Sequence, residues 1–118
     1  IEDMSHLSRV NGHLSIYSNE RLTSVSGLSS LQTVGGNLNV YDNEKLTKLQ
    51  GLDALTEVGS DMNIYGNDRL QSVAGLAALA RVGGNFFVVD NPSLPTAEVE
   101  ELAARVAQSG VSILNNGN

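Results

Sequence analysis

Hydrophobic positions recur along the chain with a period of 24 residues. The clearest column consists of Leu7, Leu31, Leu55 and Leu79. A second column with the same step consists of Ile16, Val40, Ile64 and Val88. A fixed period of this length is the signature of a repeat architecture, in which each unit buries its apolar side chains against the next unit. The pattern therefore predicts a repeat solenoid with repeats that start near residues 7, 31, 55 and 79.

The pattern changes within each repeat. Segments such as Leu14–Tyr17 and Met62–Tyr65 alternate apolar and variable residues, as expected of a short strand with one buried face. After the strand, apolar residues fall at every third position, as at Leu22, Val25 and Leu28. This spacing favours a coil that turns its corners through extended, 3₁₀-like or polyproline-like pieces. Stacked coils would then form a parallel β-sheet on one face of the solenoid.

The C-terminal end departs from the repeat. Apolar residues at helical spacing predict a capping helix over about 96–109, with Thr96 as its N-cap and Gly110 as its stop signal. Residues 111–114 alternate again and predict a final strand. The start shows no such cap, because Ile1 and Met4 align with positions inside a coil. Alternatively, Ile1 could be the end of a preceding strand. We therefore expect one solenoid domain over residues 1–118 that is a fragment of a longer precursor. Either an upstream segment has been removed, or a partner covers the open face of the first coil.

The composition removes several classes of function. The chain has 118 residues, with 7 Lys and Arg against 13 Asp and Glu, and a net charge of −6. Nucleic acids and anionic membranes attract clustered Lys and Arg, so we expect neither as a partner. The absence of cysteine excludes disulfides, thiolate metal sites and thiol catalysis. No apolar run approaches the roughly 20 residues of a membrane-spanning helix, and we expect no membrane insertion.

An asparagine follows each predicted strand, in the column Asn19, Asn43, Asn67 and Asn91. An inward-facing asparagine can bond to backbone groups of neighbouring coils, and stacked asparagines form a ladder. We interpret this column as structural and not as a ligand site.

The strand motif Leu14-x-Ile16-x-x-Asn19 resembles the core of leucine-rich repeats. The longer phrase around the strands, G-L-x-x-L-x-x-V-G-G-x-L-x-V-Y-x-N, is similar to the receptor L-domain family, and the Asn91-Pro92 ending resembles its bacterial surface-protein members. The resemblance implies a right-handed coil with a parallel sheet. It also implies a secreted or cell-surface binding or adhesion module, with any signal peptide already removed.

Alternate strand positions point away from the predicted core and form the candidate binding face. Its members are Tyr17, Tyr41, Tyr65, Phe87, Val89, Asn39 and Asn63. Exposed aromatic residues on a rigid sheet suit recognition of a protein or a glycan. The same tyrosines could instead form a cross-strand ladder that stabilises the sheet, and the two roles are compatible.

Neither catalysis nor metal binding finds support in the sequence. His6 and His13 are the only histidines, and neither belongs to a triad-like phrase. The acidic column Glu20, Glu44 and Asp68 lies beside the basic column Arg21, Lys45 and Arg69, which indicates a solvated corner. We expect no enzyme, no metal and no cofactor. The leading hypothesis is a binding module, and its alternative is a structural unit that self-associates through the uncapped first coil.

Overall fold

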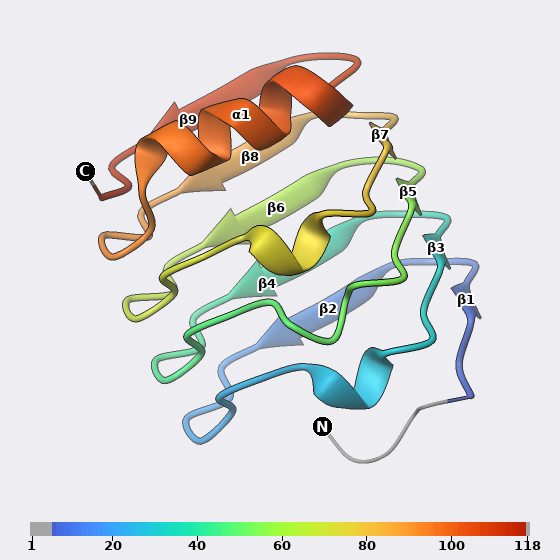
Figure 1. The fold of residues 1–118 in the computed structure, drawn as a ribbon, viewed down its shortest axis with the longest axis horizontal. Helices are drawn as coiled ribbons and strands as arrows, with labels where there is room; N and C mark the ends of the chain where they lie inside the picture. The colour runs from blue at the N-terminus through green and yellow to red at the C-terminus, as the bar shows by residue number, and fades with distance from the viewer. Residues whose placement is uncertain (1–5, 118) are drawn as a thin grey trace.

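A computed structural model describes residues 6–117 as two parallel sheets and one helix (Figure 1). The larger sheet has five strands. In spatial order they are β2 (Leu14–Tyr17), β4 (Leu38–Tyr41), β6 (Met62–Tyr65), β8 (Phe86–Val89) and β9 (Val111–Leu114). Each strand pairs with the equivalent strand of the next repeat, so that Leu14 lies opposite Leu38 and Tyr17 opposite Tyr41. The period in the sequence thus becomes the register of the sheet.

A second sheet, which the sequence pattern did not predict, accompanies the first. Its strands have two residues each and run in the order β1 (Arg9–Val10), β3 (Thr33–Val34), β5 (Glu57–Val58) and β7 (Arg81–Val82). The predicted parallel sheet is therefore confirmed in the larger sheet, and the prediction was incomplete because it did not include the smaller one. Two residues are too few to show the alternation of a half-buried strand, and these segments could be recognised only as extended corners.

The inward side chains of both sheets form one continuous core. Val40, Ile64 and Val88 of the larger sheet are fully buried, as are Val34, Val58 and Val82 of the smaller one. The first repeat differs, because Leu7, Val10, Leu14 and Leu22 are only partly buried while their equivalents in the second repeat are fully buried. The core is therefore complete in the middle of the stack and open at its first coil.

Short 3₁₀ turns and glycines bring successive coils close together between the two sheets. The turns η1 (Ser26–Leu28) and η2 (Ala74–Leu76) lie in the segments where apolar residues fall at every third position. At Gly75 an added Cβ would lie 2.2 Å from the carbonyl oxygen of Leu49 in the preceding repeat. The coils approach so closely there that only glycine fits.

The helix α1 (Thr96–Val106) lies against β9 and β7 at the end of the stack (Figure 1). The helix ends three residues before the predicted limit, and neither predicted terminus signal acts as expected. Pro95 holds the N-cap position, and the Thr96 hydroxyl donates instead to the Gly117 carbonyl. At the other end Ala107 becomes extended and forms a parallel bridge with Val82, so the helix stops before it reaches Gly110.

The positions of Ile1 and Met4, on which the expected start inside a coil depends, lie outside the described residues. Within residues 6–117, no helix combines the length and the apolar character that crossing a membrane requires.

Candidate binding face of the five-stranded sheet

Three tyrosines stack on the outer face of the larger sheet. The ring centroids of Tyr17 and Tyr41 are 4.9 Å apart at an interplanar angle of 6°, and those of Tyr41 and Tyr65 are 4.8 Å apart at 4°. These spacings match the separation of hydrogen-bonded strands, roughly 4.8 Å, because each ring rises from its own strand. The rings therefore stand edge-on to solvent, and both faces of Tyr41 are covered by its neighbours.

Phe87 lies in the neighbouring column, opposite Asn63, and packs against the last tyrosine of the stack. Its ring meets Tyr65 edge to face, with centroids 6.0 Å apart and an angle of 86°. Phe87 is 37% exposed and Leu114 of the adjacent strand is 63% exposed. Val89 shares the tyrosine column but is only 7% exposed, so it supports the surface without offering much of it. Leu114 was not among the candidate residues, although it continues the same column into the last strand.

A polar row runs beside the aromatic one. The Asn63 side-chain amide donates to Asn39 Oδ1 at 2.7 Å, and the Asn39 amide donates to Ser15 Oγ at 3.1 Å. Fixed hydrogen bonds and stacked rings leave these side chains little rotamer freedom to lose when a ligand binds. The outer face is therefore preorganised.

The stack also affects the ionisation of its central ring. The pKa of the Tyr41 phenol is raised above its ordinary value of 10.0, chiefly by desolvation, next by repulsion from the Tyr65 and Tyr17 phenols once these ionise, and least by the Asp42 carboxylate. A tyrosine hydroxyl is neutral at physiological pH even without this shift, and it can donate or accept a hydrogen bond.

The strands end at a column of left-handed residues. Ser18, Asp42, Asp90 and Asn115 have φ between 53° and 57°, and Gly66 takes the equivalent place with φ of 68°. Asp and Asn tolerate this region better than most residues. The left-handed residue turns the chain sharply, so that the following asparagine enters the core instead of continuing the outer face.

The asparagine column forms a hydrogen-bonded ladder inside the molecule. The backbone N–H and Nδ2 of Asn43 both donate to Asn67 Oδ1, and the corresponding groups of Asn67 donate to Asn91 Oδ1. Nδ2 of Asn67 also donates to the Val40 carbonyl of the preceding strand. Asn43, Asn67 and Asn91 are fully buried, and Asn116 receives the last pair of bonds. These residues hold the coils together and are not available to a ligand on the outer face.

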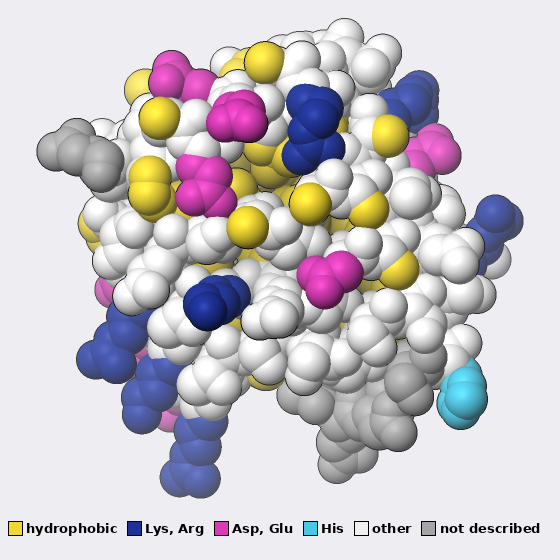
Figure 2. All heavy atoms as spheres, in the orientation of Figure 1, with side chains coloured by type: hydrophobic (Ala, Val, Ile, Leu, Met, Phe, Trp, Pro, Cys, Tyr) yellow, Lys and Arg dark blue, Asp and Glu magenta, His cyan; other side chains and the backbone are white. Residues whose placement is uncertain are grey.

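Charged side chains gather on the bends that follow the strands. The exposed basic side chains form the column Arg21, Lys45 and Arg69, and the exposed acidic ones form the column Glu20, Glu44 and Asp68. Figure 2 shows a row of Lys and Arg side chains projecting in the region of these bends. Among residues 6–117 the recorded salt bridge is a different one, Arg81 with Glu57. The two columns are therefore solvated and do not form fixed pairs across the corner.

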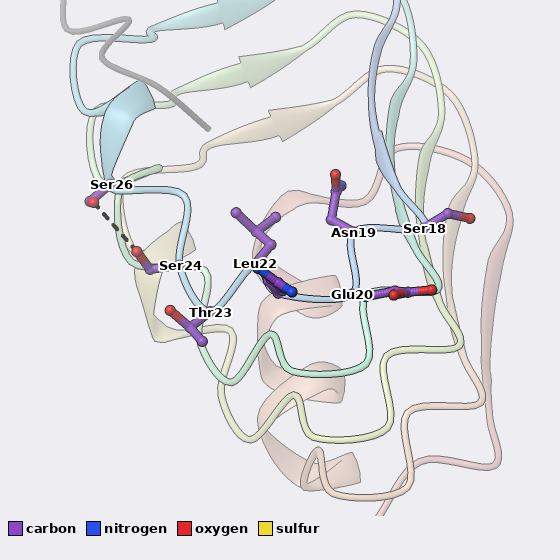
Figure 3. A pocket seen from close by; sticks show the side chains of 8 residues that line it. Ser18, Asn19, Glu20, Leu22, Thr23, Ser24 and Ser26 are labelled. Carbon is purple, nitrogen blue, oxygen red and sulfur yellow. Dashed lines mark hydrogen bonds between the residues drawn. The ribbon is translucent and has the colours of Figure 1, made fainter.

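A hollow of about 640 Å³ lies at the open end of the stack, over the bend of the first repeat. Figure 3 shows Asn19 and Leu22 pointing into it, whereas Ser18 and Glu20 point away. In later repeats the equivalents of these two inward residues are buried beneath the preceding coil.

Side chains that could ligate a metal do not cluster in the described part of the chain. Residues 6–117 contain no group of three or more His, Asp or Glu side chains placed to hold a metal ion. His13 has a structural contact, since its Nδ1 accepts the backbone N–H of Asn37 at 2.8 Å. The outer sheet face is the accessible surface on which stacked rings and hydrogen-bonded side chains contact one another.

The family to which this architecture corresponds is shown by sequence comparison. The sequence model of the Receptor L domain family matches residues 8–118, and the chain belongs to that family. Receptor L domains are ligand-binding domains found in the extracellular parts of receptors. No curated protein and no solved structure matches the chain.

Proposed function

We propose that this chain is an extracellular, non-enzymatic binding module in which the outer face of the five-stranded sheet contacts a protein ligand. One observation carries the proposal: a stack of three tyrosines, a phenylalanine against its last ring and the exposed Leu114 on the final strand present aromatic and apolar groups on one preorganised sheet face. Tyr and Phe side chains provide large contact area at low conformational cost, which is why they are enriched in recognition surfaces. Membership of a ligand-binding family supports the same conclusion.

The ring geometry favours a protein over a glycan. A sugar ring stacks on the open face of an aromatic ring, but both faces of Tyr41 are covered and one face of Tyr65 is covered by Tyr41. The row therefore offers ring edges and hydroxyl groups along most of its length. Apolar area is concentrated at Phe87 and Leu114, where a side chain of a protein ligand could be buried.

The finer description of the scaffold belongs to the same proposal. The strands of both sheets pair at a step of 24 residues, except β8 and β9, which pair at 25; this register supports a single right-handed solenoid domain of the leucine-rich-repeat type. In that scaffold the second sheet and the bends space the coils, and the five-stranded sheet presents the ligand surface. An adhesion role on a cell surface is consistent with this arrangement.

The binding proposal is tested with Phe87→Ser combined with Leu114→Ser. Both side chains are exposed, so we expect the double variant to fold, with an unfolding temperature close to that of the parent chain. A photocrosslinker at Ser112 would report proteins of the extracellular medium captured on this face, identified by mass spectrometry. We expect specific crosslinks from the parent chain and at least a tenfold loss in the double variant, about 1.4 kcal/mol.

A matched control variant is Ala104→Ser, which changes an exposed residue on the outer side of α1. It should capture the same proteins as the parent chain. Equal capture by the parent and the double variant would overturn the proposal. A parallel glycan array separates the two ligand classes, since binding of a glycan through this face would replace the protein assignment.

A further inference from the structure

The first repeat ends in an interrupted asparagine ladder. Asn19 donates its backbone N–H and its Nδ2 to Asn43 Oδ1, as later members of the column do toward their successors. Among residues 6–117, however, no group donates to Asn19 Oδ1, whereas Oδ1 of Asn43, Asn67, Asn91 and Asn116 each accepts two hydrogen bonds. Within the described part of the chain, Asn19 Oδ1 therefore lacks the two donors that its equivalents have.

The backbone around Asn19 is open on the same side. In the larger sheet β2 pairs only with β4, which leaves the other edge of β2 unpaired among the described strands. In the smaller sheet β1 pairs only with β3. An unpaired strand edge is a template for another strand.

Apolar side chains at this end of the stack are less covered than their equivalents in later repeats. Leu14 and Leu22 are only partly buried, and Leu22 points into the hollow of about 640 Å³ (Figure 3). An added Cβ at Gly12 would meet nothing within 4 Å, whereas one at the equivalent Gly36 would lie 2.9 Å from the backbone of Gly12. The first coil thus carries the residue types of an internal coil, although no described segment packs on it.

We propose that this end of the stack docks a further repeat of the same kind, which enters as a parallel strand of the pattern apolar-x-apolar-x-x-Asn. Its asparagine would donate its backbone N–H and Nδ2 to Asn19 Oδ1, and its apolar residues would cover Leu14 and Leu22. The interface would continue the one that already joins successive coils, with the same hydrogen-bond pattern and the same register. This surface is distinct from the outer sheet face.

A second copy of the whole chain fits this end less well. Its complementary surface would be the free edge of β9, beside which α1 packs at the opposite end of the stack (Figure 1). A helix with its side chains is roughly 10 Å thick, about twice the separation of paired strands. A second copy would therefore meet α1 as well as the edge of β9, and this surface does not repeat the one that joins successive coils. A separate repeat carries no such helix.

The proposal is tested by titrating a synthetic peptide with the sequence of residues 31–54 into the isotope-labelled whole chain. This peptide contains the strand Leu38–Tyr41 and the ladder residue Asn43. We expect saturable changes in the amide resonances of Ser15 and Tyr17 and of the Asn19 side chain, with slower hydrogen exchange at β2. No change up to about millimolar peptide, or changes confined to β9 or to Phe87 and Leu114, would overturn the proposal.

Matched variants distinguish pairing through the asparagine ladder from nonspecific peptide binding. A peptide carrying Asn43→Ala should bind roughly tenfold more weakly, because it loses a side-chain hydrogen bond and ladder packing. The chain variant Asn19→Ala should weaken binding to a similar extent, while Asn116→Ala at the far end of the ladder should not. Equal affinity for both peptides contradicts the mechanism. Concentration-dependent self-association of the chain alone, through β2, would replace the separate repeat with a second copy.

Discussion

At the scale of single residues, the asparagine ladder connects strand register with buried polarity. The side-chain oxygen of each buried asparagine accepts hydrogen bonds from the backbone N–H and the side-chain amide of the asparagine 24 residues earlier. Within the described residues, no buried side-chain nitrogen or oxygen lacks a partner. A buried polar column of this kind is stabilising only while it is complete. A donor in the core that loses its acceptor destabilises the fold by its full desolvation free energy.

Replacement of Asn67 tests this dependence. Asn67→Ala removes the acceptor of two Asn43 donors and leaves the Val40 carbonyl without its partner. We expect the free energy of unfolding to fall by about 3 kcal/mol, measured by urea denaturation. Asn19→Ala is the matched control, since its side chain is exposed and water can replace the lost bonds. A loss of equal size in both variants would show that the cost does not come from burial.

The residues of the ladder and of the outer face were accessible from the sequence because both follow from one period. Once Leu14 and Ile16 are placed inward, alternation sends Tyr17 outward and the common step of 24 residues stacks it on Tyr41. The burial of Val89 was not predictable from alternation, because it depends on how neighbouring side chains cover that position. The edge-to-face orientation of Phe87 likewise depends on its packing against Tyr65, and the sequence pattern does not specify that packing.

At the scale of elements, α1 is attached to the stack by polar contacts at both ends. Near its start, Glu98 Oε1 accepts the Ser72 hydroxyl at 2.9 Å and the Val73 backbone N–H at 2.8 Å. Near its end, the Arg105 guanidinium donates to the carbonyls of Leu79 and Ala77. These bonds satisfy backbone groups around η2 that have no later coil to pair with, so the helix closes the core and also completes the hydrogen bonding of the last full turn.

The attachment of α1 is tested with Glu98→Ala. The variant removes the acceptor of two hydrogen bonds, one of them from a backbone N–H beside the core, and we expect a loss of about 1–3 kcal/mol. Hydrogen exchange should accelerate in residues 96–106 and around Val73, with little change in β4. Glu98→Gln is the matched control, because its side-chain carbonyl can still accept both bonds. Unchanged exchange in the Ala variant would show that apolar packing alone holds the helix.

The elements also show where the sequence was insufficient. The helix signals at Thr96 and Gly110 were sound local propensities, but tertiary contacts decided otherwise. The Thr96 hydroxyl binds the Gly117 carbonyl, and the bridge between Ala107 and Val82 ends the helix early. The smaller sheet escaped prediction because its pairing depends on the stacking of coils, while each strand of two residues has no pattern of its own.

At the scale of the whole molecule, the proposed solenoid is a one-dimensional stack in which each coil contacts mainly its neighbours. Its stability is then approximately a sum of coil terms and coil–coil interfaces, and one additional coil should add one of each. A duplicate of residues 55–78 inserted directly after Ala78 preserves every column, because the step is 24 residues. The added coil would carry its own tyrosine, glycine corner and ladder asparagine.

We expect this insertion variant to fold with one more strand in each sheet and one more tyrosine in the stack. The denaturant m-value should rise by roughly a fifth, because it scales with the surface exposed on unfolding, and the unfolding midpoint should not fall. A matched variant whose insert lacks Gly66 has a step one residue short, which moves inward side chains to the outer face of the sheet. It should unfold earlier or lose cooperativity. If both inserts behaved alike, the added segment would be a loop outside the stack, and the period would not be the unit from which this molecule is built.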